Sequence, residues 1–329
     1  MSLIWLITGA NRGIGKGILS QVLSRPNTTV IAALRDISDS TATELAEVPV
    51  ASGSKLIVVK VDASSDTDAQ DAVESLQSQH GISHIDVVLA NSGILTQWGP
   101  VSEVTPEDLR KHFEVNTIAP IKLFQATKSL LEKSENPRFF ITSSTIASIG
   151  LMDTIPMPTI AYGLTKAAAN YATSKIHFEN PKISAVALHP GWVQTRMGEH
   201  AADMAGLAEI PVTIQDSASG LIKQIDQTTK ETLSGKFVGF DGNPQCFPRT
   251  HQIVHQKKTL PPKNRYPPSS TAFPFVHETA ANAGILDLEL VPGALGGERR
   301  PTRAGSIAIA LGEVEGRDKM VVHDGDTMV

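Results

Sequence analysis

Thr8-Gly9-Ala10-Asn11-Arg12-Gly13-Ile14-Gly15, close to the start of the chain, is the stretch that decides the fold. It follows a short apolar run at residues 3–7 and precedes an expected helix over about residues 14–23. Glycines let a backbone turn sharply and lie close to a phosphate, and the amides at a helix N-terminus attract that anion. A glycine-rich turn alone is often only a loop, but a strand before it and a helix after it are the context that a dinucleotide-binding turn requires.

Apolar runs separated by helical patterns continue along the chain. Strands that are apolar throughout, and that alternate with helices, are typical of a parallel sheet covered on both faces. The sequence therefore predicts one α/β domain over residues 1–247, a doubly wound Rossmann-type fold with a parallel seven-stranded sheet. The strands are expected at residues 3–7, 28–34, 55–61, 86–90, 138–142, 182–188 and 235–240.

The sequence changes character after Phe247. Eight of the twenty prolines fall in residues 248–329, and no helical or strand period continues there. Such a segment buries too little apolar surface to offset the entropy of ordering it. We therefore expect residues 248–329 to be a mostly disordered extension, or an artefact of gene prediction, rather than a second functional domain.

The composition excludes several classes of protein. A net charge of −5 does not suggest a surface for nucleic acid or for an acidic membrane. The apolar run at the N-terminus is far too short to span a bilayer, and no apolar run elsewhere in the sequence is long enough either. The single cysteine, Cys246, cannot form an internal disulfide or a cysteine metal site, which fits a reducing compartment. We expect a cytoplasmic protein without a metal, with no nucleic-acid or membrane partner.

Arg35 and Asp36 follow the expected second strand. At this position an acidic side chain accepts from the ribose 2′-hydroxyl of NAD, whereas an arginine accommodates the 2′-phosphate of NADP. Arg35 comes first, and Arg12 lies in the glycine turn nearby, so the pattern favours NADP(H). A solvated Arg35 beside a ribose-binding Asp36 is the alternative. Asp62 follows the third strand, where it could contact the adenine.

Tyr162 and Lys166 are four residues apart in an expected helix that begins near Thr159. That spacing puts both side chains on one face of the helix, where the ammonium would favour the phenolate and lower the pKa of Tyr162. Ser143 and Ser144 follow the fifth strand, at the edge of the sheet where ligands bind.

Asn116 and Pro120 lie in an expected helix that starts at Thr105. Pro120 has no amide hydrogen, so the carbonyl of Asn116 could hold a water molecule. A tolerated kink beside a polar surface residue fits these residues equally well. The pattern alone does not choose between the two.

Three segments around these residues bear on the site. Residues 150–158 are expected to be a non-helical loop because of their prolines, and residues 199–211 an irregular substrate lid. His189, before a Pro-Gly turn, is expected to be structural rather than catalytic. Candidate pocket walls are Trp98, Trp192 and Met197.

Together, these motifs resemble the short-chain dehydrogenases/reductases over about residues 3–247. The resemblance rests on the glycine turn, Asn91-Ser92-Gly93, Asn116, Ser143-Ser144, Tyr162-x-x-x-Lys166 and Pro190-Gly191 in this order. Residues 86–91, 175–180 and 229–238 further resemble ketoreductases of fungal polyketide pathways within that family. This likeness implies a small-molecule ketone of secondary metabolism as the substrate, and a monomer or a homo-oligomer.

The resemblance implies a role for each motif residue. Tyr162 would be the general acid, Lys166 would lower its pKa and bind the nicotinamide ribose, Ser144 would polarise the carbonyl, and Asn116 would anchor a proton-relay water. The implied residues that bind NADP(H) are Gly9, Asn11, Arg12, Gly13, Ile14, Gly15, Arg35, Asp62, Asn91, Gly93, Tyr162, Lys166, Pro190, Gly191, Val193 and Thr195.

The chain departs from the family pattern in two places. Ser92 stands where an alanine is usual, and the interval between Ser144 and Tyr162 is longer than the family norm. Ser148 lies closer to the customary distance and is the alternative to Ser144. The expected function is an NADPH-dependent ketoreductase. The alternatives are an alcohol dehydrogenase working in the oxidative direction and a non-catalytic NADP-binding regulatory protein.

Overall fold

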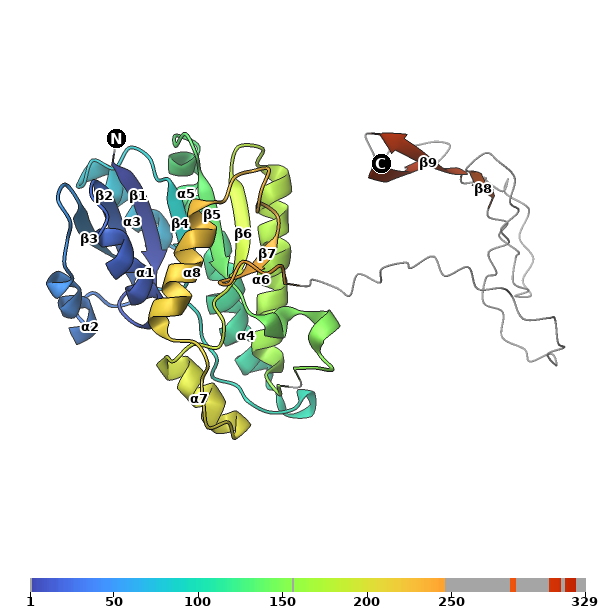
Figure 1. The fold of residues 1–329 in the computed structure, drawn as a ribbon, viewed down its shortest axis with the longest axis horizontal. Helices are drawn as coiled ribbons and strands as arrows, with labels where there is room; N and C mark the ends of the chain where they lie inside the picture. Colours follow the sequence, from blue (N-terminus) through green and yellow to red (C-terminus); the bar gives the residue numbers. More distant parts are fainter. Residues whose placement is uncertain (1, 156, 246–284, 288–307, 315–316, 324–329) are drawn as a thin grey trace. The chain divides into compact units, whose positions relative to one another are not determined.

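A computed structural model describes residues 2–155, 157–245, 285–287, 308–314 and 317–323. Seven strands form one parallel sheet in the order β3-β2-β1-β4-β5-β6-β7, which confirms the predicted fold (Figure 1). The strands are β1 Leu3–Thr8, β2 Thr28–Leu34, β3 Lys55–Lys60, β4 Val87–Ala90, β5 Arg138–Thr142, β6 Ser184–His189 and β7 Phe237–Gly239.

Helices connect successive strands and cover the sheet. The α-helices are α1 Gly13–Leu23, α2 Ser40–Thr43, α3 Asp68–Ser78, α4 Pro106–Phe113, α5 Ala119–Leu131, α6 Ile160–Glu179, α7 Arg196–Ala205 and α8 Ile214–Asp226. Short 3₁₀ turns are η1 Glu44–Glu47, η2 Val101–Glu103, η4 Thr145–Ala147 and η5 Ile149–Leu151, and a π-helical segment, η3, spans Glu114–Ile118.

The core lies on both faces of the sheet. Leu6 and Phe139 pack in one apolar cluster with residues of α3, α5 and α6, whereas Ile7 and Phe140 pack in another with residues of α1 and α8. Because successive strand residues point to opposite faces, a strand covered on both faces must be apolar throughout. All residues of β2 are buried, which explains why residues 30–34 are apolar without interruption.

The strand order reverses at β1. This strand pairs with β2 on one side and with β4 on the other. From β1 the chain continues to β2 on one side, whereas from β4 it continues to β5 on the other side. Open α/β sheets bind their ligands in the crevice at the carboxyl ends of the strands beside such a reversal. The glycine turn follows β1 at this edge, and Asn91 follows β4.

The helix expected from Thr105 is interrupted rather than simply kinked. It starts with a capping box, in which Thr105 Oγ1 accepts from the amide of Asp108 at 3.1 Å. The wider π-helical segment η3 then separates α4 from α5, with the amide of Ala119 bonded to the carbonyl of Glu114. Pro120 follows directly and cannot donate to the carbonyl of Asn116. The π-helical segment therefore lies where the α-helical hydrogen bonds must be interrupted.

The prediction of an irregular lid over residues 199–211 is wrong for its first half, which belongs to helix α7. Thr195 begins this helix by accepting from the amide of Gly198 at 3.1 Å, and Gly206, with φ of 67°, ends it in the left-handed conformation. Residues 150–158 are largely a loop as expected, apart from η5 and from Pro156, which lies outside the described residues.

The chain divides into two units, Met1–Val254 and His255–Val329. The described strands of the second unit are β8 Ile285–Asp287, β9 Ala308–Val314 and β10 Arg317–His323, which form an antiparallel sheet in the order β10-β9-β8. No strand was predicted at these positions. The rest of residues 248–329, for which disorder is predicted, and Cys246 lie outside the described residues. The predicted boundary at residue 247 stays a prediction.

Candidate active site

The glycine turn after β1 is shaped to hold a phosphate close to the backbone. Gly9 and Gly13 have φ of 63° and 52°, a region that side chains disfavour. A Cβ on Gly15 would lie 2.3 Å from the carbonyl oxygen of Gly9. Arg12 precedes α1 without capping it by its side chain, so the first amides of the helix remain for an anion. The turn therefore fits the pyrophosphate of a nicotinamide cofactor.

Asn91 holds the turn from the next strand. Its Nδ2 donates to the carbonyl of Thr8 at 3.0 Å, while the amides of Asn91 and Ser92 donate to Thr8 Oγ1 at 2.9 and 3.0 Å. The side chain of Asn91, predicted to bind the cofactor, thus ties β4 to β1. Asn11, also predicted there, donates from Nδ2 to Thr41 Oγ1 at 2.6 Å and fastens α2 to the turn.

The region beyond β2 presents an arginine and a carboxylate that is already bonded. Arg35 is exposed, as is Arg12 in the glycine turn. Asp36 Oδ1 accepts from the amide and the hydroxyl of Ser38 at 2.8 and 2.6 Å, and these bonds lower the pKa of Asp36. Asp62 Oδ1 accepts in the same way from the amide and the hydroxyl of Ser64. Both carboxylates are engaged within their own turns.

Tyr162 and Lys166 lie together in α6 at the carboxyl edge of the sheet. Lys166 is 3% exposed, and its Nζ donates to the carbonyl of Thr142, at the end of β5, at 2.6 Å. The same Nζ lies 5.5 Å from the centroid of the Tyr162 ring, which is itself buried. A hydrogen bond joins Tyr162 to the Ser144 hydroxyl. The phenol, the ammonium and a strand-end hydroxyl therefore meet in one small volume.

Burial controls the ionisation of this pair. It raises the pKa of Tyr162 to about 12, against the smaller lowering effect of the Ser144 hydrogen bond. It also lowers the pKa of Lys166 to about 8. The expected lowering of the Tyr162 pKa by the ammonium is thus outweighed, because the phenolate would lose its solvation. At neutral pH the phenol holds its proton and Lys166 remains mostly charged.

The Ser144 hydroxyl is hydrogen-bonded to the phenol of Tyr162. Ser144 caps η4 by accepting from the amide of Ile146 at 3.3 Å, which fixes its side chain at the end of β5. Ser148 is also buried, at the end of the same short turn. The extra residues before Tyr162 follow as η5 and the loop after it. The long interval therefore leaves Ser144 beside Tyr162.

Asn116 is fully buried in η3, and both ends of its side chain are hydrogen-bonded. Oδ1 accepts from the amide of Ile94 at 2.8 Å, and Nδ2 donates to the carbonyl of Ile94 at 3.0 Å and to Thr165 Oγ1 at 3.1 Å. A Cβ on Gly93 would lie 3.3 Å from Asn116 Oδ1 and 3.5 Å from Lys166 Nζ. Thr165 was not among the predicted site residues, and its only local signal is its place next to Lys166.

The turn after β6 closes the site. Gly191 has φ of 86°, and a Cβ there would lie 2.9 Å from the Phe240 ring. Val193, after Pro190, pairs with Val212, and the methyl of Thr195 lies 3.3 Å from the Cβ position of Gly13. The predicted residues of this turn and of the glycine turn, including Ile14 at the start of α1, thus border one region.

His189 ends β6 just before that turn. Burial lowers its pKa to about 4, more than Asp241 raises it, so the imidazole is neutral at physiological pH. Among the described residues its Nδ1 has no hydrogen-bond partner. His189 Nδ1 therefore makes no hydrogen bond to Tyr162 or Lys166.

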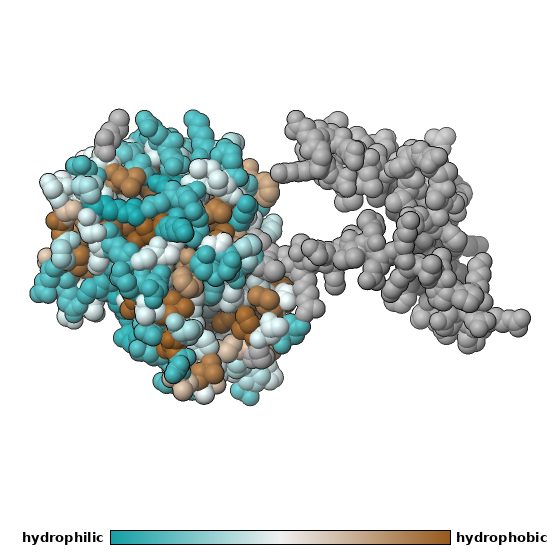
Figure 2. All heavy atoms as spheres, in the orientation of Figure 1, coloured by the Kyte–Doolittle hydropathy of each residue, from teal (hydrophilic) through white to brown (hydrophobic). Residues whose placement is uncertain are grey.

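Apolar side chains are exposed on α7 and on η5 and the loop after it. Figure 2 shows apolar surface at the lower end of the view, where Figure 1 labels α7. Trp192, a candidate pocket wall, donates from Nε1 to the carbonyl of Gly198 at 3.1 Å and so supports the start of α7. The exposed residues are Ile149 in η5, Met152 just after it, Met197 and Met204 in α7, and Leu207 two residues after α7.

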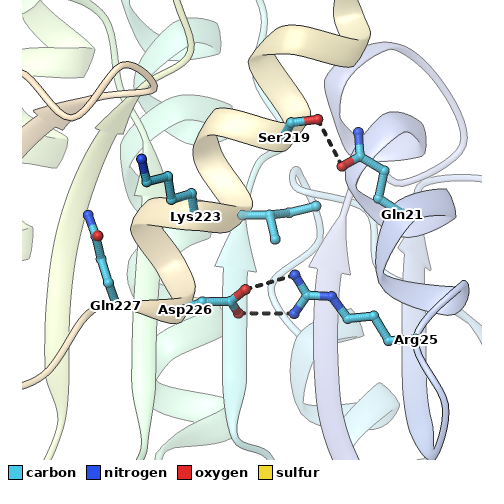
Figure 3. A pocket seen from close by; sticks show the side chains of 7 residues that line it. Gln21, Arg25, Ser219, Lys223, Asp226 and Gln227 are labelled. Atoms are coloured by element: carbon cyan, nitrogen blue, oxygen red, sulfur yellow. Dashed lines mark hydrogen bonds and ion pairs between the residues drawn. The ribbon is translucent and has the colours of Figure 1, made fainter.

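A separate hollow lies between α1 and α8, away from these residues (Figure 3). It has a volume of about 510 Å³ and is spanned by the ion pair of Arg25 with Asp226, at 2.7 and 3.1 Å. Its other side chains are polar apart from Ile222. None of the predicted site residues lines it.

Among the described residues, no helix is long and apolar enough to cross a membrane. No group of three or more His, Cys, Asp or Glu side chains in that part of the chain could hold a metal ion.

Comparisons with known proteins agree with this arrangement. Residues 4–206 match the family model described as short chain dehydrogenase. Two curated relatives named norsolorinic acid ketoreductase, from Aspergillus parasiticus and Dothistroma septosporum, are each 44% identical over 237 residues. These matches cover 71% of this chain and 87% and 88% of the relatives. They confirm the resemblance inferred from the motifs.

Solved structures show the same fold. NADPH-bound carbonyl reductase from chicken fatty liver matches with a TM-score of 0.66 and 28% identity, over 75% of this chain and all of that one. Carbonyl reductase Sniffer of Drosophila melanogaster matches with a TM-score of 0.65 and 25% identity, over the same shares.

Proposed function

Since the chain belongs to the short-chain dehydrogenase family and is an oxidoreductase, we propose that it is an NADPH-dependent ketoreductase. Its substrate would be a ketone on an aromatic polyketide or a similar secondary metabolite. The observation that carries the proposal is the buried, protonated Tyr162 with the Lys166 ammonium and the Ser144 hydroxyl beside it. The relatives named norsolorinic acid ketoreductase support the substrate class.

The glycine turn would hold the cofactor's pyrophosphate on the first amides of α1. Arg35 and Arg12 are free to meet a 2′-phosphate, while the Asp36 carboxylate is turned back onto Ser38 and is a poor partner for a 2′-hydroxyl. This arrangement supports NADPH over NADH. When bound, NADPH supplies the hydride that reduces the ketone carbon.

Tyr162 would give its proton to the ketone oxygen as that oxygen gains negative charge, and Ser144 would hydrogen-bond the same oxygen. A phenol with a pKa of about 12 is a weak acid, so the phenolate needs stabilising as it forms. Lys166 provides a positive charge for this and is held in place by the carbonyl of Thr142.

Asn116 would anchor a water that returns a proton to Tyr162 through Lys166. Its side chain is fully engaged with Ile94 and Thr165, so its part in this relay falls to the main-chain carbonyl. Pro120, four residues on, has no amide hydrogen to offer that carbonyl.

The apolar side chains of α7 and η5 would receive the rings of the substrate. Methionines such as Met197 and Met204 adapt to flat aromatic surfaces of differing outline. This supports a bulky aromatic ketone over a small aliphatic one.

The test is NADPH consumption by the full chain with a panel of ketones. We expect oxidation of NADPH with aromatic polyketide ketones at a kcat/KM well above that for simple aliphatic ketones. Binding of NADPH without oxidation across the panel would contradict the proposal and favour a regulatory, non-catalytic protein.

A further inference from the structure

Residues 94–99, which we call the bridging segment, join the site at two ends. At the far end, the amide of Gly99 donates to the carbonyl of Pro158 at 2.7 Å, and the amide of Ala161 donates to Gln97 Oε1 at 3.4 Å. Ala161 immediately precedes Tyr162, and its amide lies in the first turn of α6. The bridging segment therefore holds the end of the helix that carries Tyr162.

At the near end, Ile94 is bonded through both its amide and its carbonyl to the side chain of Asn116. Gly93, one residue earlier, lies where a Cβ would contact Asn116 Oδ1 and Lys166 Nζ. A shift of the bridging segment would therefore move groups that lie next to both Tyr162 and Lys166.

The middle of the bridging segment is held by His112, which is fully buried in α4. Its Nε2 accepts from the amide of Thr96 at 3.2 Å, and its Nδ1 donates to the carbonyl of Asp108 at 2.7 Å. An amide can only donate and a carbonyl can only accept, so the two partners require a neutral imidazole with its hydrogen on Nδ1.

His112 and Asn116 are four residues apart in the chain and contact alternate residues of the bridging segment, Thr96 and Ile94.

We propose that His112 is a positioning residue for the reaction at Tyr162, an inference that rests on the proposed function. Through the amide of Thr96 it fixes the bridging segment, and through Gln97 and Gly99 the segment fixes the first turn of α6. A histidine that only filled the core would contribute to stability without influencing the geometry at Tyr162.

Two substitutions separate these roles. His112→Phe keeps the bulk of the ring and removes the acceptor for Thr96, whereas His112→Gln can place its Oε1 near the position of Nε2. Lys111→Gln, at the exposed neighbouring residue of the same helix, is the matched control. His112→Asn, which keeps a donor for Asp108 but is too short for Thr96, replaces His112→Phe if that variant does not fold.

Amide hydrogen exchange of the cofactor-free full chain tests the contact itself. We expect His112→Phe to speed exchange at Thr96 about tenfold or more, because the amide loses its acceptor, and His112→Gln to restore most of the protection. Unchanged exchange at Thr96 in His112→Phe would overturn the proposal, whether or not the wild type reduces a ketone.

Steady-state kinetics test the consequence. Misplacing a catalytic group costs roughly 10- to 100-fold, so we expect that loss in kcat/KM for the ketone in His112→Phe, with the Kd for NADPH within about threefold of wild type. His112→Gln should recover most of the loss and Lys111→Gln should show none. Equal losses of kcat/KM in His112→Gln and His112→Phe would also overturn the proposal that His112 is a positioning residue. A wild type inactive with every ketone would instead contradict the proposed function.

Discussion

Replacing Lys166 with methionine should change how the protein's stability depends on pH. Lys166 is buried, and burial lowers its pKa from 10.5 to about 8. Between these two values the unfolded chain binds a proton at Lys166 that the folded chain does not. Stability therefore rises with pH across that window and levels off above it.

The size of the effect follows from the two pKa values. Between pH 7 and pH 9.5, proton linkage at Lys166 contributes a rise of about 2 kcal/mol in the free energy of unfolding. Tyr162 works in the opposite direction, because its raised pKa makes the folded state lose stability as pH rises, but only above about pH 10. The window below pH 9.5 therefore isolates Lys166.

Urea unfolding of the cofactor-free protein at several pH values measures this directly. The unfolding free energy of the wild type minus that of Lys166→Met should increase by about 2 kcal/mol from pH 7 to pH 9.5. Lys175→Met, at an exposed lysine of the same helix paired with Glu179, is the control and should show no such increase. A difference that stays flat over this range would refute the reasoning that Lys166 is held charged against a burial cost.

Two further predictions concern the cofactor. Arg35→Ser should raise the KM for NADPH roughly tenfold and leave the KM for NADH nearly unchanged, since only NADPH carries the 2′-phosphate; equal effects on both in steady-state kinetics would contradict the assigned contact. Gly15→Ala would put a methyl group 2.3 Å from the carbonyl of Gly9, so the turn must shift and NADPH binding, followed by its fluorescence, should be lost; wild-type affinity would contradict the predicted cradle.

Much of the fold could be predicted because its signals are local. The apolar runs of the strands, the glycine turn and the spacing of Tyr162 and Lys166 are each contained in a few neighbouring residues. Helix α7 was missed because its ends depend on backbone geometry, with a threonine cap before it and a left-handed Gly206 after it.

The contacts that complete the site could not be predicted in the same way. Lys166 bonds to a carbonyl on β5, and His112 bonds to an amide beyond β4, so both depend on how distant segments meet. The pKa of Tyr162 was predicted in the wrong direction because the spacing reveals a nearby charge but not the depth of burial. The choice of Ser144 likewise depended on where η4 turns the chain.

The central claim is that Tyr162 supplies the proton to the substrate, and Tyr162→Phe tests it most directly. The variant removes one hydroxyl from a buried ring and leaves the glycine turn untouched, while Tyr171→Phe, at an exposed tyrosine of the same helix, is the matched control. With ketone and NADPH, we predict that Tyr162→Phe loses turnover by at least about 10³-fold while binding NADPH as wild type does, and that Tyr171→Phe keeps full activity. Turnover by Tyr162→Phe at the wild-type rate would contradict the account.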